Sequence, residues 1–388
     1  MQPGEWESPL HAADVAKAGV TASWPSIVGD DIWWVETRPE EGGRRVIVSE
    51  KHGDLIAAPW SASTSVHEYG GRSYLGIPTS SGYTIYFANK SDQRLYRASE
   101  SQAPVALTPE SNREFRYAEL TQVGDEIWCV RESVTQESTT REIVAISVQG
   151  EIRTLVSGHQ FYMSLRVSPD GQHLSWISWE HPQMPWDGTE LFVADIENGA
   201  ISQKRILAGS KTNPVLSPEW IDSTTLLYID EESGWWNPWK VSLDGKKAQI
   251  INEKSEWGYP AWQLGYVGVA MLDHGKFIAL HGPVDERKVA LVDLNTSTYR
   301  DFETDYTAFV PSFCTDRKKV VIFGANAKSF PTLVELDPAS LNVSRVIRPN
   351  PLPIPSTFAP KIEEISIPGR GREVKVILHQ PQHPTEKV

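Results

Sequence analysis

The fold of this chain is constrained most by a strand-rich unit that recurs seven times. One copy, LRVSPDGQHLSWISWEHPQMPWDGTELFVADIENG, contains short runs of aromatic and β-branched residues separated by turn residues. Comparable units begin at Ala22, Tyr69, Arg116, Leu165, Pro214, Tyr266 and Phe309. Their spacing of about 45–50 residues is typical of propeller blades. The strand-like runs predict an all-β fold. Because a single sheet cannot bury both of its faces alone, the units are expected to stack radially against their neighbours. The prediction is a seven-bladed β-propeller of four-stranded antiparallel blades over residues 21–349.

The segments on either side of the repeats have a different character. SPLHAADVAKAG predicts a short helix within residues 1–20. RPNPLPIPSTFAP holds five prolines in thirteen residues, so we expect a stiff linker over residues 350–360. Residues 361–388 predict two strands around a PGRGR turn. Because an isolated hairpin is marginally stable, these strands are expected to open a second domain that this chain does not complete.

Composition excludes several kinds of partner. A net charge of −13 and a pI near 5.3 argue against nucleic acid, which needs a basic face. The two cysteines, Cys129 and Cys314, stand far apart, which argues against a disulfide framework and favours a reducing, cytoplasmic location. The N-terminus lacks the pattern of a signal peptide, and no apolar run reaches the roughly 20 residues that span a bilayer. We therefore expect no membrane partner.

The stretch SVHEYGGRSY, residues 65–74, places a histidine and a glutamate beside two glycines. Zinc proteases carry H-E-x-x-H, but the position of the second histidine is Gly71 here, so the metal interpretation fails. Gly70 and Gly71 are expected to allow a tight bend or a close approach where a strand begins. His67, Glu68 and Tyr69 remain candidates for substrate recognition.

Catalytic motifs are missing from the sequence. The nucleophile elbow G-x-S-x-G does not occur, no phosphate-binding glycine loop follows a strand, and the ten histidines lack metal-ligand spacing. Adjacent carboxylates such as Asp30 and Asp31 are expected to lie on the solvated surface. We predict no catalytic residue, no metal and no cofactor in this chain.

Two aromatic loops stand out from the repeats. WEHPQMPWDGTEL, residues 179–191, is predicted to be a long insertion between two strands, and loops on a rigid scaffold are common recognition sites. Its candidates are His181, Met184, Trp186 and Asp187. DEESGWWNPWKV, residues 230–241, contributes Trp235 and Trp236. Packing over or between blades is the alternative for both loops, and for the second it is the stronger one.

The chain resembles the N-terminal propeller of the prolyl oligopeptidase family of serine peptidases. Within that family it is most similar to the acylaminoacyl-peptidase and dipeptidyl-aminopeptidase-like branch. The resemblance rests on VHEYGGRSY, HPQMPWDGTELFVADI, LLYIDEESGWWNPWKV, EWGYPAWQLG and ISIPGRGREVKVILHQPQ. It implies an unclosed propeller that caps an α/β-hydrolase domain with a Ser-Asp-His triad. That domain would begin near Lys361 and continue past Val388. The chain would then be either a fragment of a longer peptidase or a naturally shortened one, and the incomplete hairpin favours the fragment.

The resemblance implies that this chain is the non-catalytic, substrate-gating propeller of a cytosolic serine peptidase. The whole enzyme would cleave short peptides, as an aminopeptidase, acylaminoacyl-peptidase or oligopeptidase, and this chain alone would have no peptidase activity. Its partners would be short peptides, its own hydrolase domain and a further copy in a homo-oligomer. A free-standing interaction propeller is the alternative, although the repeats lack the Gly-His and Trp-Asp signature of WD repeats. A third possibility is a complete propeller enzyme such as a glycosidase or lactonase, which would need carboxylates or metal ligands from several blades to converge on the central channel.

Overall fold

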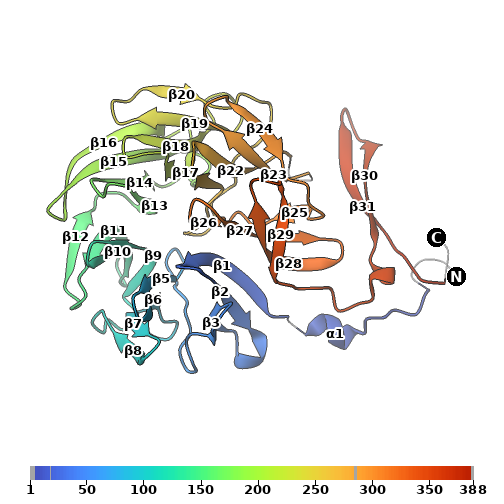
Figure 1. Cartoon of the computed structure of the whole chain (residues 1–388), viewed down its shortest axis with the longest axis horizontal. Helices are drawn as coiled ribbons and strands as arrows, with labels where there is room; N and C mark the ends of the chain where they lie inside the picture. The colour runs from blue at the N-terminus through green and yellow to red at the C-terminus, as the bar shows by residue number, and fades with distance from the viewer. Residues whose placement is uncertain (1–4, 18, 284–285, 386–388) are drawn as a thin grey trace.

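The computed structural model describes residues 5–17, 19–283 and 286–385, in which seven β-sheets form a ring (Figure 1). Blades 1 to 4 contain β1 (Thr21–Val28), β2 (Asp31–Arg38), β3 (Arg44–Ser49), β4 (Gly53–Asp54); β5 (Tyr74–Thr79), β6 (Gly82–Ala88), β7 (Leu95–Ser99), β8 (Gln102–Ala106); β9 (Phe115–Val123), β10 (Glu126–Val134), β11 (Thr139–Ile146), β12 (Ile152–Val156); and β13 (Phe161–Val167), β14 (His173–Trp179), β15 (Thr189–Glu197), β16 (Ala200–Ser210). Blades 5 to 7 contain β17 (Val215–Trp220), β18 (Thr225–Asp230), β19 (Asn237–Ser242), β20 (Lys247–Gln249); β21 (Val269–Leu272), β22 (Lys276–His281), β23 (Lys288–Asp293), β24 (Thr298–Asp301); and β25 (Ala308–Phe309), β26 (Cys314–Thr315), β27 (Val320–Asn326), β28 (Ser329–Asp337), β29 (Asn342–Arg348). The predicted seven-bladed propeller is confirmed.

Short elements flank the ring. Helix α1 (Ala12–Ala16) precedes it, and the hairpin of β30 (Lys361–Pro368) and β31 (Glu373–Gln380) follows it. Two single 3₁₀ turns, η1 (Pro39–Glu41) and η2 (Ser356–Phe358), lie in connections. No helix in the described part of the chain is long and apolar enough to span a membrane.

The second strand of several blades contains a buried tryptophan, which explains the repeated aromatic runs of the sequence. Trp33, Trp128 and Trp176 are at most 1% exposed. Each indole N–H has a polar partner two residues away in the same strand, such as the Asp31 carboxylate at 2.7 Å from Trp33. The large rings can therefore fill the spaces between blades without leaving a buried donor unpaired.

The ring closes between blade 7 and blade 1 without a shared strand. Each sheet is built from consecutive strands, and in blade 7 the innermost strand is split into β25 and β26, which both pair with β27. Phe323 of blade 7 packs in one apolar cluster with residues of blades 1 and 2. Arg348 pairs with Glu36 across the same seam at 2.8 Å. The Ile27 N–H of blade 1 also donates to the Cys314 thiol of blade 7 at 3.1 Å. Contacts that involve side chains, and not a shared strand, therefore join the first and last blades directly.

One of the two faces of the ring contains the links between blades and the loops between the second and third strands of each blade. We call it the linker face. In an antiparallel four-stranded sheet, the first strand begins and the fourth strand ends at the same edge. The propeller begins at Thr21 and ends at Arg348, so α1 and the β30–β31 hairpin both connect to the ring at the linker face. Both lie on the same side of the ring in Figure 1. The hairpin leaves apolar side chains substantially exposed, namely Ile362, Ile365, Ile367, Ile377 and Leu378.

Candidate functional site

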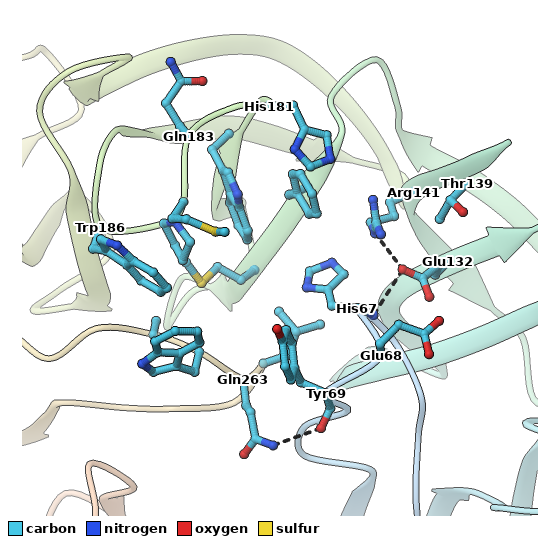
Figure 2. Close-up of a pocket in the computed structure, with 18 residues that line it drawn as sticks. His67, Glu68, Tyr69, Glu132, Thr139, Arg141, His181, Gln183, Trp186 and Gln263 are labelled. Carbon is cyan, nitrogen blue, oxygen red and sulfur yellow. Dashed lines mark hydrogen bonds and ion pairs between the residues drawn. The ribbon is translucent and has the colours of Figure 1, made fainter.

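A pocket of about 320 Å³ opens on the linker face (Figure 2). Four segments line it: the link from blade 1 to blade 2, the adjoining ends of β10 and β11, the β13–β15 region of blade 4, and the link from blade 5 to blade 6. Its walls are formed largely by aromatic rings. Charged side chains gather at one end, around Glu132 and Arg141.

The link from blade 1 to blade 2 forms a strained turn at the pocket. His67 and Glu68 have φ values of 55° and 65°, which non-glycine residues adopt rarely. Gly70 has a φ of 73°, and a side chain there would meet the Thr64 carbonyl at 2.5 Å. A Cβ at Gly71 would lie 2.4 Å from a carbonyl oxygen of the opposite link. The expectation that the two glycines allow a tight bend or a close approach is confirmed, and the structure assigns the bend to Gly70 and the close approach to Gly71.

A buried carboxylate anchors that turn. Glu132 is 1% exposed, and its Oε2 accepts the His67 backbone N–H at 3.1 Å and the Arg141 Nε at 2.7 Å. Its Oε1 accepts Arg116 Nη1 at 3.3 Å, and the same nitrogen bonds the Ser65 carbonyl at 2.9 Å. The strained backbone therefore persists because a buried network of ion pairs and hydrogen bonds around Glu132 holds it in place.

The aromatic floor of the pocket comes from blade 4. Phe161 and Trp179 stack with their ring centroids 4.9 Å apart, and His181 meets Phe161 edge-on at 4.8 Å. The Arg141 guanidinium lies over the other end of this group, 4.4 Å from the Phe161 centroid. A flat apolar group could lie against this floor with little loss of hydration.

The rim of the pocket is also aromatic but more exposed. The rings of Trp186, from blade 4, and Trp262, from the link between blades 5 and 6, have centroids 4.5 Å apart, and Tyr69 approaches Trp262 edge-on at 6.4 Å. Trp262 is 53% exposed and Tyr69 is 62% exposed. Large exposed rings at the mouth of a preformed cavity are typical of a binding surface.

His67 stands between the charged end and the aromatic floor. Its Nε2 is buried and has no hydrogen-bond partner among the described residues. Burial, together with the nearby charge of Arg141, lowers the pKa of His67 to about 3. The imidazole is therefore neutral at physiological pH.

This pKa predicts a pH-dependent stability. Below a pH of about 6.5 His67 is protonated in the unfolded chain but stays neutral in the folded protein. The free energy of unfolding therefore falls as the pH drops from 6.5 toward 3. Between pH 6.5 and pH 5 this loss should be on the order of 2 kcal/mol. His67→Asn, which tolerates a positive φ, should flatten this part of the profile in urea denaturation. The matched control is His274→Asn, because His274 has a φ of 60° and is exposed. Equal slopes for His67→Asn and the wild type would contradict the assignment.

The structure brings six of the nine predicted recognition residues into this pocket: His67, Glu68, Tyr69, His181, Met184 and Trp186. Asp187 lies outside the lining, where its carboxylate accepts the Met184 N–H at 2.9 Å and closes the turn that presents Trp186. Trp235 and Trp236 belong to the β18–β19 loop of blade 5, also outside the lining.

Several residues of the pocket were missed by the sequence reasoning. Glu132 and Arg141 lie in adjacent strands and gave no signal beyond an ordinary alternating pattern. Trp262 and Gln263 belong to EWGYPAWQLG, a stretch that supported the family resemblance but received no role. Gln263 donates to the Tyr69 carbonyl at 2.9 Å, which joins the two links across the pocket (Figure 2).

No protein-family profile and no curated protein matches the chain by sequence. Solved structures do match it. A puromycin-hydrolyzing peptidase from Mycobacterium tuberculosis superposes with a TM-score of 0.92 at 36% identity over 98% of this chain. A puromycin hydrolase gives 0.91 at 28% identity, also over 98%. The chain has the seven-bladed propeller fold of the N-terminal domain of the prolyl oligopeptidase family. It spans 62% of the length of each of these two structures.

Prolyl oligopeptidases share the fold at much lower sequence identity. Prolyl oligopeptidase B from Galerina marginata superposes with a TM-score of 0.67 at 11% identity, over 92% of this chain and 55% of that one. At that identity the likeness concerns architecture alone. Within the described residues of this propeller, no group of three or more His, Cys, Asp or Glu side chains is arranged to hold a metal ion.

Proposed function

We propose that this propeller recognises and gates substrate for a serine peptidase that cleaves short peptides in the cytosol. The observation that carries the proposal is the position of the pocket, which opens on the linker face, where the chain passes to the β30–β31 hairpin. The exposed apolar residues of that hairpin would be covered by a hydrolase domain of the whole protein. Similarity to two puromycin-hydrolysing enzymes over 98% of the chain supports amide-bond hydrolysis by the whole protein.

The pocket favours an uncharged aromatic or long apolar side chain of the peptide. Glu68, Glu132 and Arg141 line its charged end. Arg116, which lies outside the lining, pairs with both glutamates, and Arg141 pairs with Glu132, so the four charges balance. The remaining walls are formed by aromatic rings and by other uncharged side chains, such as Met163 and Leu264. A charged ligand group would lose hydration there without gaining an unpaired counter-ion, whereas an aromatic group loses little. The finer assignment among aminopeptidase, acylaminoacyl-peptidase and oligopeptidase depends on residues outside this pocket.

Activity tests the first part of the proposal. The protein expressed from the whole open reading frame should hydrolyse chromogenic aminoacyl or acyl-aminoacyl amides, and a serine-directed inhibitor should abolish the reaction. The 388-residue chain should release no product in the same assay. Hydrolysis by this chain alone that the inhibitor blocks, or an inactive whole protein, would overturn the proposal.

Binding tests the role of the pocket. In ligand-observed NMR titrations of this chain, N-acetyl-L-phenylalaninamide should bind at least about tenfold more tightly than N-acetyl-L-lysinamide. Trp262→Ala should weaken the binding of N-acetyl-L-phenylalaninamide by roughly tenfold, because a well-packed ring contributes on the order of 1–2 kcal/mol to binding. Trp235→Ala is the matched control, since Trp235 is a 37% exposed tryptophan on the same face that does not line the pocket. Equal losses in both variants would exclude the pocket as the binding site.

A further inference from the structure

Residues 263–268, which we call the axial segment, run from the pocket to the start of β21 in blade 6 and contact the opposite side of the ring. The Gly265 N–H donates to the Glu119 carboxylate of β9 in blade 3 at 2.7 Å. The Leu264 carbonyl accepts the Arg72 N–H, just before blade 2, at 2.9 Å. Blades 2 and 3 lie across the ring from blade 6, so these bonds cannot be contacts between neighbouring blades.

The axial segment also reaches blades 1 and 5. Tyr266 packs against Trp24 of β1, with ring centroids 5.3 Å apart. The Gly268 N–H donates to the Ser217 hydroxyl of β17 at 3.2 Å. Each of these contacts is made to the first strand of a blade, and first strands surround the axis of a propeller.

Blade 7 completes the set of contacts. Val267 pairs with Ser312 as a parallel bridge, and its carbonyl accepts the Phe313 N–H at 3.1 Å. This pairing occurs between β25 and β26, where the innermost strand of blade 7 is interrupted. A segment this short can reach blades 1, 3, 5 and 7 together only by lying across the axis of the ring.

Glu119 is the strongest single attachment of the axial segment. Its side chain projects from a left-handed backbone position, with a φ of 54°, and the residue is 8% exposed. Its second oxygen accepts the Leu165 N–H of blade 4 at 3.3 Å. One buried carboxylate therefore joins blade 3, blade 4 and the axial segment. Nearby Arg166 is paired separately with Glu219 at 2.6 Å.

We propose that the axial segment closes the axis of the ring at the linker face, and that Glu119 is a positioning residue for the pocket. Trp262, Gln263 and Leu264 form one wall of the pocket, and they directly precede the glycine that Glu119 binds. Glu119 thus fixes this wall through the segment without lining the pocket itself. A ligand reaches the pocket along the linker face and not through the ring.

Hydrogen exchange of the intact chain, followed by mass spectrometry, tests this arrangement without any ligand. In the wild type, residues 263–268 should be protected like the blade strands. Glu119→Ala should speed their exchange by on the order of tenfold or more, because the Gly265 N–H loses its carboxylate acceptor and the segment loses its attachment to blade 3. Glu219→Ala is the matched control, since it removes the other carboxylate near Arg166 and leaves the bond to Gly265 intact. Glu119→Gln, which keeps one acceptor oxygen, should restore part of the protection and serves also if Glu119→Ala does not fold.

A change on the segment itself gives a second approach. Gly265 has a φ of 97°, and a Cβ there would lie 2.5 Å from the Arg72 Cβ. Gly265→Ala should therefore release the same six-residue region from protection. Wild-type exchange at the rate of an exposed loop would overturn the proposal. So would equal effects of Glu119→Ala and Glu219→Ala, which would indicate a general loss of stability. Because no probe ligand is used, failure of aromatic binding would leave this result unaffected.

Discussion

Glu132→Ala is expected to lower the free energy of unfolding by about 3–5 kcal/mol, the cost of leaving buried partner charges uncompensated. The carboxylate is 1% exposed, and the guanidiniums of Arg116 and Arg141 that it binds are 14% and 11% exposed. Alanine would remove both ion pairs and the acceptor of the His67 N–H. Urea denaturation at pH 7 measures the change directly.

A surface ion pair of similar geometry provides the control for Glu132→Ala. Asp54 binds both terminal nitrogens of Arg38 at 2.6 Å, but its side chain is 43% exposed. Asp54→Ala should cost no more than about 1 kcal/mol, because water replaces the lost partner. A similar loss for both variants would show that Glu132 is better hydrated than its position indicates. Glu132→Gln should fall between the two, since the amide keeps one acceptor oxygen.

The propeller could be predicted from the sequence because its determinants are local. Each strand shows its own alternation, each turn carries its own glycine or aspartate, and each blade needs only its neighbours for burial. Trp33, Trp128 and Trp176 each lie in the second strand of a blade, and all three are fully buried in the structure. The seven repeats therefore give the blade number without knowledge of any long-range contact.

The charged end of the pocket could not be predicted in the same way. Glu132 faces Arg116 on one neighbouring strand and Arg141 on the other, so the network depends on the register of three strands. Blade 3 contains a register shift between Trp128 and Val130 that the sequence does not reveal. Without that register, an isolated glutamate in a strand is most simply a surface residue.

The expectation that Asp31 is solvated was wrong for a related reason. Asp31 is 5% exposed and accepts the Trp33 indole N–H at 2.7 Å. A buried tryptophan needs a partner for its N–H, and two residues along a strand lie on the same side of the sheet. The spacing of Asp31 and Trp33 therefore contained the signal, which the rule for adjacent surface carboxylates obscured.

Gly71→Ala should destabilise the protein by about 1–3 kcal/mol and also weaken aromatic binding, as expected when a well-packed site is overfilled. The added Cβ would lie 2.4 Å from the Leu264 carbonyl oxygen and 2.9 Å from the Leu264 Cβ. Both atoms belong to a backbone region held by the Arg72 N–H, so neither can rotate away as a flexible side chain would. The link into blade 2 or the axial segment must shift.

Either shift reaches the pocket, because Tyr69 lies on one side of Gly71 and Leu264 lies opposite it, and both residues line the cavity. Denaturation and titration with N-acetyl-L-phenylalaninamide should therefore both respond. Gly19→Ala is the matched control, since no atom lies within 4 Å of its added Cβ and both properties should stay at wild-type values. If Gly71→Ala matched the wild type in both measurements, the two links could not be in the close contact that shapes the pocket. Loss of stability without loss of binding would place the strain in the link into blade 2 and leave the wall formed by Trp262 intact.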